Sequence, residues 1–178
     1  MLLNLRKIHG ARAHETVTRQ YEPAAFEGAD ESYAVIAPVD LAFELDKDAE
    51  RFRLAGRVRT TLELPCSRCL EPFALPVDAA FDLRYLPHSQ NTGEGEVEIE
   101  DEDLATAYYD DETIDLGQLM REQFYLALPM KPLCSDACRG LCPVCGANLN
   151  RTTCACDRTW QDPRLAGLRA IAKKDDDA

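Results

Sequence analysis

The chain has 178 residues, and its 20 Lys and Arg against 32 Asp and Glu give a net charge of -12. This balance argues against binding nucleic acid through bulk electrostatics, so any such contact must be local. The length suits one domain with an appendage, because single domains commonly run to ~100–150 residues. The opening stretch, MLLNLRKIHGARAHE, carries charges after only a few apolar positions, which predicts neither a signal peptide nor a membrane span. We therefore expect a cytoplasmic protein.

The N-terminal part of the chain is predicted to contain at least one strand. Residues 1–20 mix apolar and basic side chains and fit either an edge strand or a mobile arm, and the pattern does not decide between them. Apolar side chains then recur at every second position from Tyr33 to Leu45, which is the period of a half-buried strand. The acidic and basic residues at 46–48 are predicted to form a turn.

Residues 51–64 are predicted to form a second strand with two different faces. The apolar face holds Phe52, Leu54, Val58, Leu62 and Leu64, and the opposite face holds a basic stripe of Arg51, Arg53, Arg57 and Arg59. Side chains two apart on one face stand close enough to build a local positive potential. The slightly favoured interpretation is a solvated face paired with acids on a neighbouring strand. The other interpretation is an RNA-binding surface formed by these four arginines together with Arg68.

A CxxC motif, Cys66 and Cys69, lies between this strand and the next alternating run, from Phe73 to Tyr85. The simplest geometry is a β-hairpin whose tip holds both thiolates and needs two further ligands. Pro76 removes a backbone donor, which predicts an edge or a bulge at that point.

A loop and a helix are predicted after this hairpin. Residues 87–113 are rich in acids, with no Lys or Arg between Arg84 and Arg121, which is typical of a solvated or disordered segment rather than a catalytic one. Asp115 is a helix cap with Gln118 three residues on, and apolar residues at helical spacing continue to Leu128. We expect this amphipathic helix to cover the open face of the sheet.

Six of the eight cysteines lie between residues 134 and 156, in the run CSDACRGLCPVCGANLNRTTCAC. A disulfide framework would need an oxidising compartment, whereas cysteine clusters in a reducing cytosol more often bind metal. Thiolates in spacings of this kind saturate a structural Zn²⁺. The predicted metal ligands are Cys66, Cys69, Cys134, Cys138, Cys142, Cys145, Cys154 and Cys156.

Eight thiols fit two four-thiolate sites, and two groupings are open. The preferred grouping joins residues 142, 145, 154 and 156 in one site, and 66, 69, 134 and 138 in the other. The competing grouping joins 134, 138, 142 and 145, and leaves 66, 69, 154 and 156. His9, His14 and His88 are not at ligand spacing from a cysteine pair, and catalytic zinc usually keeps a position open. The pattern therefore favours structural zinc.

The last residues are predicted to form a short helix, which begins near Asp162 and Pro163, and a disordered tail from Asp175. The sequence therefore predicts an α+β fold, with an antiparallel β-sheet, a packed helix and a C-terminal cysteine-rich zinc module. We divide it into an antiparallel β region with the CxxC hairpin tip (1–90), an acidic loop and amphipathic helix (91–132), a zinc-binding cysteine module (133–158), and a short helix with a disordered tail (159–178).

With these motifs in view, the chain resembles the YceD family of proteins, which are needed for the accumulation of large-subunit ribosomal RNA. The matching stretches are CSRCLEPF at 66–73, IDLGQLMREQFYLALPMKPLC at 114–134 and GLCPVCGANLN at 140–150. The resemblance implies a role in the synthesis, processing or stability of 23S ribosomal RNA, with no defined catalytic activity and no catalytic residues to transfer.

We therefore expect a non-enzymatic zinc protein of large-subunit biogenesis, whose partner is ribosomal RNA or a large-subunit ribosomal protein. The expected protein has no membrane contact, and its oligomeric state is left open. Two other functions remain: a zinc and thiol redox switch, in which oxidation ejects the metal, and a metal-dependent hydrolase acting on RNA, which would require an open coordination position.

Overall fold

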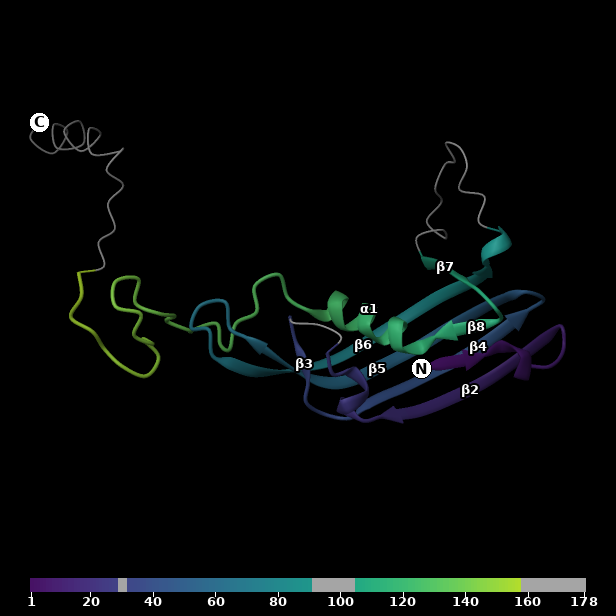
Figure 1. The fold of residues 1–178 in the computed structure, drawn as a ribbon, viewed down its shortest axis with the longest axis horizontal. Coiled ribbons are helices and arrows are strands. Elements are labelled where there is room, and N and C mark those ends of the chain that lie inside the picture. Colours follow the sequence, from purple (N-terminus) through teal and green to yellow (C-terminus); the bar gives the residue numbers. More distant parts are fainter. Residues whose placement is uncertain (29–31, 91–104, 158–178) are drawn as a thin grey trace, which may run out of the picture. The chain divides into compact units, whose positions relative to one another are not determined.

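A computed structural model describes residues 1–28, 32–90 and 105–157 (Figure 1). The chain divides into two compact units. The sheet unit consists of Met1–Cys66 and Glu71–Cys134, and the cysteine unit consists of Ser67–Leu70 and Ser135–Ala178, of which residues up to 157 are described. The predicted short helix near Asp162 and the tail from Asp175 lie outside the described residues.

In its described residues, the sheet unit contains strands, one α-helix and three short 3-10 turns. In chain order these are β1 (Leu2–Asn4), η1 (Leu5–Lys7), β2 (Arg12–Tyr21), η2 (Pro23–Phe26), β3 (Ala34–Val35), β4 (Val39–Asp48), β5 (Arg51–Pro65), β6 (Pro72–Pro87), η3 (His88–Gln90), β7 (Thr106–Tyr109), β8 (Thr113–Asp115) and α1 (Leu116–Ala127). The main sheet has the order β2-β4-β5-β6-β7, with β3 also paired to β5, and β1 pairs with β8 in a second, two-stranded sheet. The predicted α+β class is confirmed.

The predicted hairpin is the longest feature of the sheet. Strands β5 and β6 pair antiparallel without interruption from Phe52 opposite Tyr85 to Pro65 opposite Pro72. Pro76 lies opposite Thr61 of β5, and β7 pairs with β6 only from Arg84 to Pro87. Among the described residues, the part of β6 around Pro76 is therefore an edge, as the missing donor predicts. The period-2 pattern of both strands is thereby confirmed.

Three expectations about the first half of the chain are settled. Residues 12–21 form β2, which pairs antiparallel with β4 over its whole length. β2 is the edge strand because it stands at the end of the strand order. The predicted turn at 46–48 is wrong, since β4 runs to Asp48 and the reversal falls at Ala49, whose φ is 56°. The strand predicted from Tyr33 to Leu45 is two strands, β3 and β4, and the break contains Pro38, which has no N–H to give to a ladder.

The acidic region predicted to be a loop contains two short strands. β7 pairs parallel with the end of β6, so the main sheet is mixed and not purely antiparallel as predicted. β8 pairs antiparallel with β1 in the second sheet. Strands of three or four residues leave too few alternations to be recognised from their pattern. Residues 91–104, where most of the predicted loop falls, lie outside the described part of the chain.

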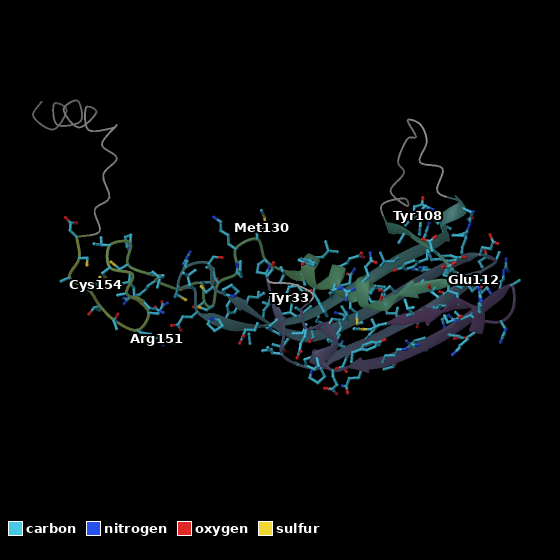
Figure 2. The ribbon with its side chains drawn as sticks, viewed as in Figure 1. Tyr33, Tyr108, Glu112, Met130, Arg151 and Cys154 are labelled. Atoms are coloured by element: carbon cyan, nitrogen blue, oxygen red, sulfur yellow. The ribbon has the colours of Figure 1, made fainter. Side chains whose placement is uncertain are left out.

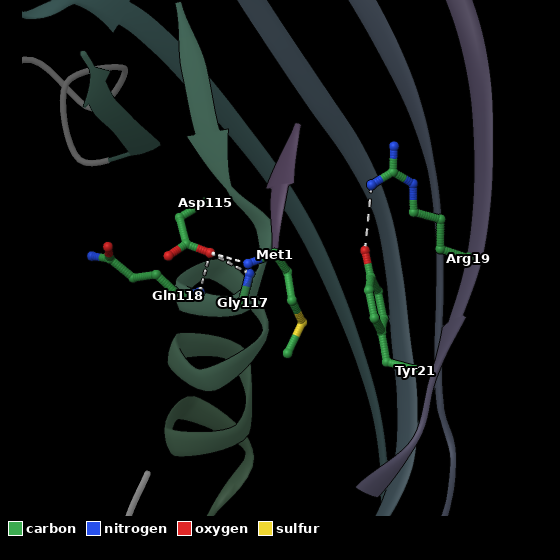
Figure 3. Close-up of polar contacts among 6 residues, drawn as sticks. All are labelled: Met1, Arg19, Tyr21, Asp115, Gly117 and Gln118. Atoms are coloured by element: carbon green, nitrogen blue, oxygen red, sulfur yellow. Dashed lines mark hydrogen bonds and ion pairs between the residues drawn. The ribbon is translucent and has the colours of Figure 1, made fainter. Parts of the chain in front are cut away.

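The predicted helix begins at the predicted cap. An oxygen of Asp115 accepts hydrogen bonds from the backbone N–H groups of Gly117 (2.8 Å) and Gln118 (3.3 Å), and lies 3.5 Å from the amino group of Met1 (Figure 3). Burial would raise the pKa of Asp115, but these two backbone donors lower it below its ordinary value. Such caps are worth ~1 kcal/mol. The Gln118 side chain instead donates to Glu122, one turn on.

The amphipathic helix covers the sheet, as expected, and packs against β6 and β1 (Figure 1). Phe124 is fully buried, and its ring makes edge contacts with Phe26 (5.6 Å between centroids) and Tyr33 (6.0 Å). The helix ends at Ala127, and its C-cap residue, Leu128, directly precedes Pro129. In the described residues, no helix is long and apolar enough to cross a membrane.

Gly56, in the middle of β5, lies between Phe43 of β4 and Phe81 of β6 in the strand register. The two rings are 6.5 Å apart between centroids. A Cβ atom at position 56 would lie 2.3 Å from the carbonyl oxygen of Ala42 and 2.5 Å from the Cβ of Phe43. Glycine is therefore required here because the neighbouring backbone approaches too closely for any side chain.

The substitution Gly56→Ala should lower the stability of the sheet unit by about 1–3 kcal/mol, the usual cost of overpacking. Urea denaturation followed by circular dichroism measures this loss. The control, Ala80→Ser, adds one atom on the exposed face of β6 and should change stability by less than ~0.5 kcal/mol. Equal midpoints for Gly56→Ala and the unmodified chain would contradict the close approach of β4.

Candidate metal centre

The eight cysteine sulfurs gather in two groups of four. The first tetrad is Cys66, Cys69, Cys134 and Cys138, and the second tetrad is Cys142, Cys145, Cys154 and Cys156. Within each tetrad all sulfur atoms lie within 4.8 Å of one another. The structure therefore adopts the grouping that the sequence favoured, and the competing grouping is wrong.

The distances fit a metal ion held by four sulfurs. Zn–S bonds of about 2.3 Å in a tetrahedron place the sulfurs about 3.8 Å apart, within the observed limit. Each tetrad supplies only thiols, the donors that select zinc or another soft metal over magnesium or calcium. Both groups can therefore hold a metal ion.

The first tetrad takes its ligands from two turns. The hairpin turn after β5 closes with a hydrogen bond from the Cys66 N–H to the Glu71 carbonyl (2.9 Å), and Leu70 adopts a left-handed φ of 61° to complete it. The other turn is closed by a hydrogen bond from the Cys138 N–H to the Ser135 carbonyl (3.0 Å). Two turns far apart in the sequence therefore supply the cysteines of this tetrad.

Arg68, which lies between the two hairpin cysteines, forms hydrogen bonds with backbone groups. Its Nη1 donates to the carbonyl oxygens of Cys138 (2.9 Å) and Asp136 (3.2 Å). Its own carbonyl accepts from the Leu141 N–H (3.1 Å). Gly140 lies next to the Arg68 carbonyl and has a φ of 73°. A Cβ atom at position 140 would lie 3.0 Å from that carbonyl oxygen. The predicted RNA contact of Arg68 is untested, but the residue organises the chain around the cysteines.

The second tetrad is built on the CPVCG turn. The Gly146 N–H donates to the Cys142 carbonyl (2.9 Å), and the Cys142 N–H donates to the Ala147 carbonyl (2.8 Å). Gly146 has a φ of 71°, a left-handed conformation that glycine adopts without steric cost. Cys142 is buried and Cys145 is exposed, whereas Cys154 and Cys156 are intermediate.

The pKa values of Cys142 and Cys156 in the second tetrad shift in opposite directions. Backbone hydrogen bonds from Cys145 and Val144 lower the pKa of Cys142 to about 6. A hydrogen bond with the Cys145 side chain and, to a smaller extent, burial raise the pKa of Cys156 to about 12. A metal that binds all four sulfurs must therefore displace protons, as it does in thiolate sites generally.

Asn150 is a supporting residue that the sequence analysis missed. Its Nδ2 donates to the sulfur of Cys138 (3.2 Å), and its Oδ1 accepts from the Arg139 N–H (2.7 Å). Groups that hydrogen-bond to ligands orient them and tune the metal. The GANLN motif contains this residue, but spacing alone does not tell a ligand-supporting Asn from a turn residue.

The basic stripe of β5 is largely paired with acids of β6. Arg53 bonds Asp82, and Asp78 lies 2.9 Å from Arg57 and 3.2 Å from Arg59. Hydrogen bonds from these arginines lower the pKa of both carboxyl groups. The favoured interpretation, a solvated face paired with neighbouring acids, is confirmed for these three arginines, and their RNA-binding role stays a prediction.

Comparison with known proteins points to one family. The family described as "Large ribosomal RNA subunit accumulation protein YceD" matches residues 54–172. Proteins described as "Large ribosomal RNA subunit accumulation protein YCED homolog 1, chloroplastic" are 32% identical over 142 residues in Zea mays and 30% identical over 146 residues in Arabidopsis thaliana. The alignments cover 67% and 70% of this chain, and 48% and 46% of the plant proteins. The chain thus spans about half the length of these relatives.

A relative of similar length has no described function. The uncharacterized protein YlbN of Bacillus subtilis is 26% identical over 144 residues, which cover 80% of this chain and 79% of that protein. No solved structure matches the chain.

Replacing Arg68 by Met should speed the loss of metal from the first tetrad, because the variant keeps the side-chain length but loses the donors to two carbonyls. Hydrogen bonds from a charged group are worth ~1.5–3 kcal/mol, and partial exposure places the loss near the lower end. Release into a chromogenic chelator measures the rate. Arg139→Met, which changes an exposed side chain in the same unit, is the control. Equal release rates in the two variants would show that Arg68 does not support the site.

Proposed function

Because the chain belongs to the YceD family, we propose that it is a non-enzymatic factor that supports the accumulation of large-subunit ribosomal RNA. The family description and the names of the plant relatives both carry this role. For this chain we place the action in the synthesis, processing or stability of 23S ribosomal RNA, during assembly of the large subunit in the cytoplasm. The partner is ribosomal RNA or a large-subunit ribosomal protein.

The observation that carries the non-enzymatic proposal is the composition of the two tetrads. Four thiolates fill a tetrahedral zinc site, whereas a catalytic zinc keeps a position for water or substrate. The eight cysteines supply four sulfurs to each tetrad, so zinc bound in this way would be saturated by protein. We therefore assign both zinc ions a structural role, with Cys66, Cys69, Cys134, Cys138, Cys142, Cys145, Cys154 and Cys156 as ligands.

Structural zinc also explains how a short, loop-rich segment holds a defined shape. Residues 135–157 contain no regular helix or strand, only turns and one isolated bridge between Leu141 and Asn148. A segment of this kind buries little apolar surface, so metal binding would supply much of its folding free energy. The tetrads would then present the surrounding loops as a rigid surface to a ribosomal partner.

The purified chain should contain two zinc ions, as measured by plasma mass spectrometry against protein concentration. The double variants Cys66→Ser with Cys69→Ser, and Cys142→Ser with Cys145→Ser, should each retain about one ion, because each removes half of one tetrad. A stoichiometry of one in the unmodified chain would contradict two independent sites. Zinc retained through mild peroxide treatment would also dismiss the redox-switch alternative.

In cells that lack the endogenous protein, the unmodified chain should restore the ratio of large-subunit to small-subunit ribosomal RNA, and both double cysteine variants should fail to do so. Quantified total RNA gives the ratio, and immunoblots confirm that each variant accumulates. Ala80→Ser serves as a matched variant that should rescue fully. An unchanged ribosomal RNA ratio after loss of the protein would refute the proposed function.

A further inference from the structure

Strand β2 is a long edge of the main sheet (Figure 1). It stands at the end of the strand order and pairs with β4 over ten residues in an unbroken register. Among the described residues, no strand pairs with its outer side. The backbone N–H and C=O groups along such an edge can pair with another strand, and proteins usually guard them with proline, lysine or a short strand. The sequence of β2, RAHETVTRQY, contains neither proline nor lysine.

The other edges of the main sheet carry such guards. β7 has only four residues, and the part of β6 that β7 leaves unpaired contains Pro72 and Pro76. Proline cannot donate a backbone hydrogen bond and is typical of edges that stay unpaired. In the part of the chain that the structure describes, β2 is therefore the edge best suited to accept a further strand along its whole length.

The charges on the exposed face of β2 are compensated within the chain. Arg12 lies 3.4 Å from Asp48, and Nδ1 of His14 lies 2.6 Å from Asp46, so both side chains are paired with acids of β4. These groups serve the contact between β2 and β4 and do not call for a partner.

The charges on the other face of β2 are not compensated in this way. Glu15, Val17 and Arg19 stand in register with buried apolar residues of β4. Nη1 of Arg19 lies 3.5 Å from the Tyr21 hydroxyl oxygen, a long hydrogen bond (Figure 3), and neither Glu15 nor Arg19 forms an ion pair with another described residue. The two residues are four positions apart on one strand, roughly 13 Å, which is too far for them to pair with each other.

A second copy of β2, antiparallel and related by a two-fold axis at Val17, brings these charges together. Glu15 of each chain then lies directly opposite Arg19 of the other. Opposite charges in directly opposed positions stabilise a sheet, and like charges destabilise it. An axis at Glu15 or Arg19 would set like charges opposite each other, and an axis at Thr16 or Thr18 would leave both charges unmatched. An axis between two residues would set the buried face of one sheet beside the exposed face of the other.

We propose that two copies of this chain pair through β2, antiparallel and with Val17 on the two-fold axis, so that their main sheets form one continuous sheet. A second copy fits this edge because the strand is complementary to itself in charge. The same interface then contains the ion pair between Glu15 and Arg19 twice. This pairing is independent of the proposed role in ribosomal RNA accumulation.

Sedimentation velocity of the zinc-loaded full chain over about 1–200 µM should show an equilibrium between monomer and dimer. Glu15→Arg sets arginines opposite each other and Arg19→Glu sets glutamates opposite each other, so each variant alone should weaken dimerisation about 10-fold or more. An equimolar mixture of the two variants should dimerise about as tightly as the unmodified chain, because every opposed pair then has opposite charges. The control, Glu63→Arg, makes the same reversal on exposed β5 and should change the affinity less than about 2-fold.

An unmodified chain that stays monomeric over this range would overturn the proposal and show that the charges on this face guard the edge against pairing. A dimer that persists in both single variants would place the interface elsewhere. The double variant Glu15→Arg with Arg19→Glu keeps both pairs opposite in sign, and it decides the question if thermal melting shows that a single variant is destabilised. Failure of both the mixture and the double variant to dimerise would refute the register at Val17.

Discussion

The β5–β6 hairpin is the constraint on which the rest of the molecule depends. Its unbroken antiparallel pairing runs from Phe52 and Tyr85 to Pro65 and Pro72, where the turn holds Cys66 and Cys69. At the other end, the same two strands bring Arg53 opposite Arg84. A one-residue slip would move every side chain to the other face. Register in one hairpin therefore fixes the ligand turn, the buried face and the basic end together.

The parts of this fold that could be predicted from the sequence are those with a long, regular signal. Both hairpin strands repeat over many residues, and Asp115 stands at a position where a cap has a clear chemical reason. The turn at Ala49 gave no such signal, because alanine rarely adopts a positive φ and the charged residues before it look like a turn. The strands β7 and β8 are too short to show a period, and their partners, β6 and β1, lie far away in the sequence.

The candidate sites show the same division between local and long-range information. Spacing singled out all eight cysteines but left two groupings open, and the preferred one, in which the CPVC and CAC pairs close on each other, is the one that the structure adopts. The pairing of Arg57 and Arg59 with Asp78 was only one of two interpretations, since it depends on the register of β5 against β6. The position of Arg84 opposite Arg53 likewise exists only in the folded sheet, and no local pattern predicts it.

The two tetrads differ in how much of the chain must fold before a metal can bind. The second tetrad draws its sulfurs from Cys142 to Cys156, so the loop to be closed is short. The first joins Cys69 to Cys134, across the segment that contains β6, β7, β8 and α1, and a longer loop costs more entropy to close. The second tetrad can therefore assemble from local sequence, whereas the first requires the β5–β6 turn and α1 to be in place.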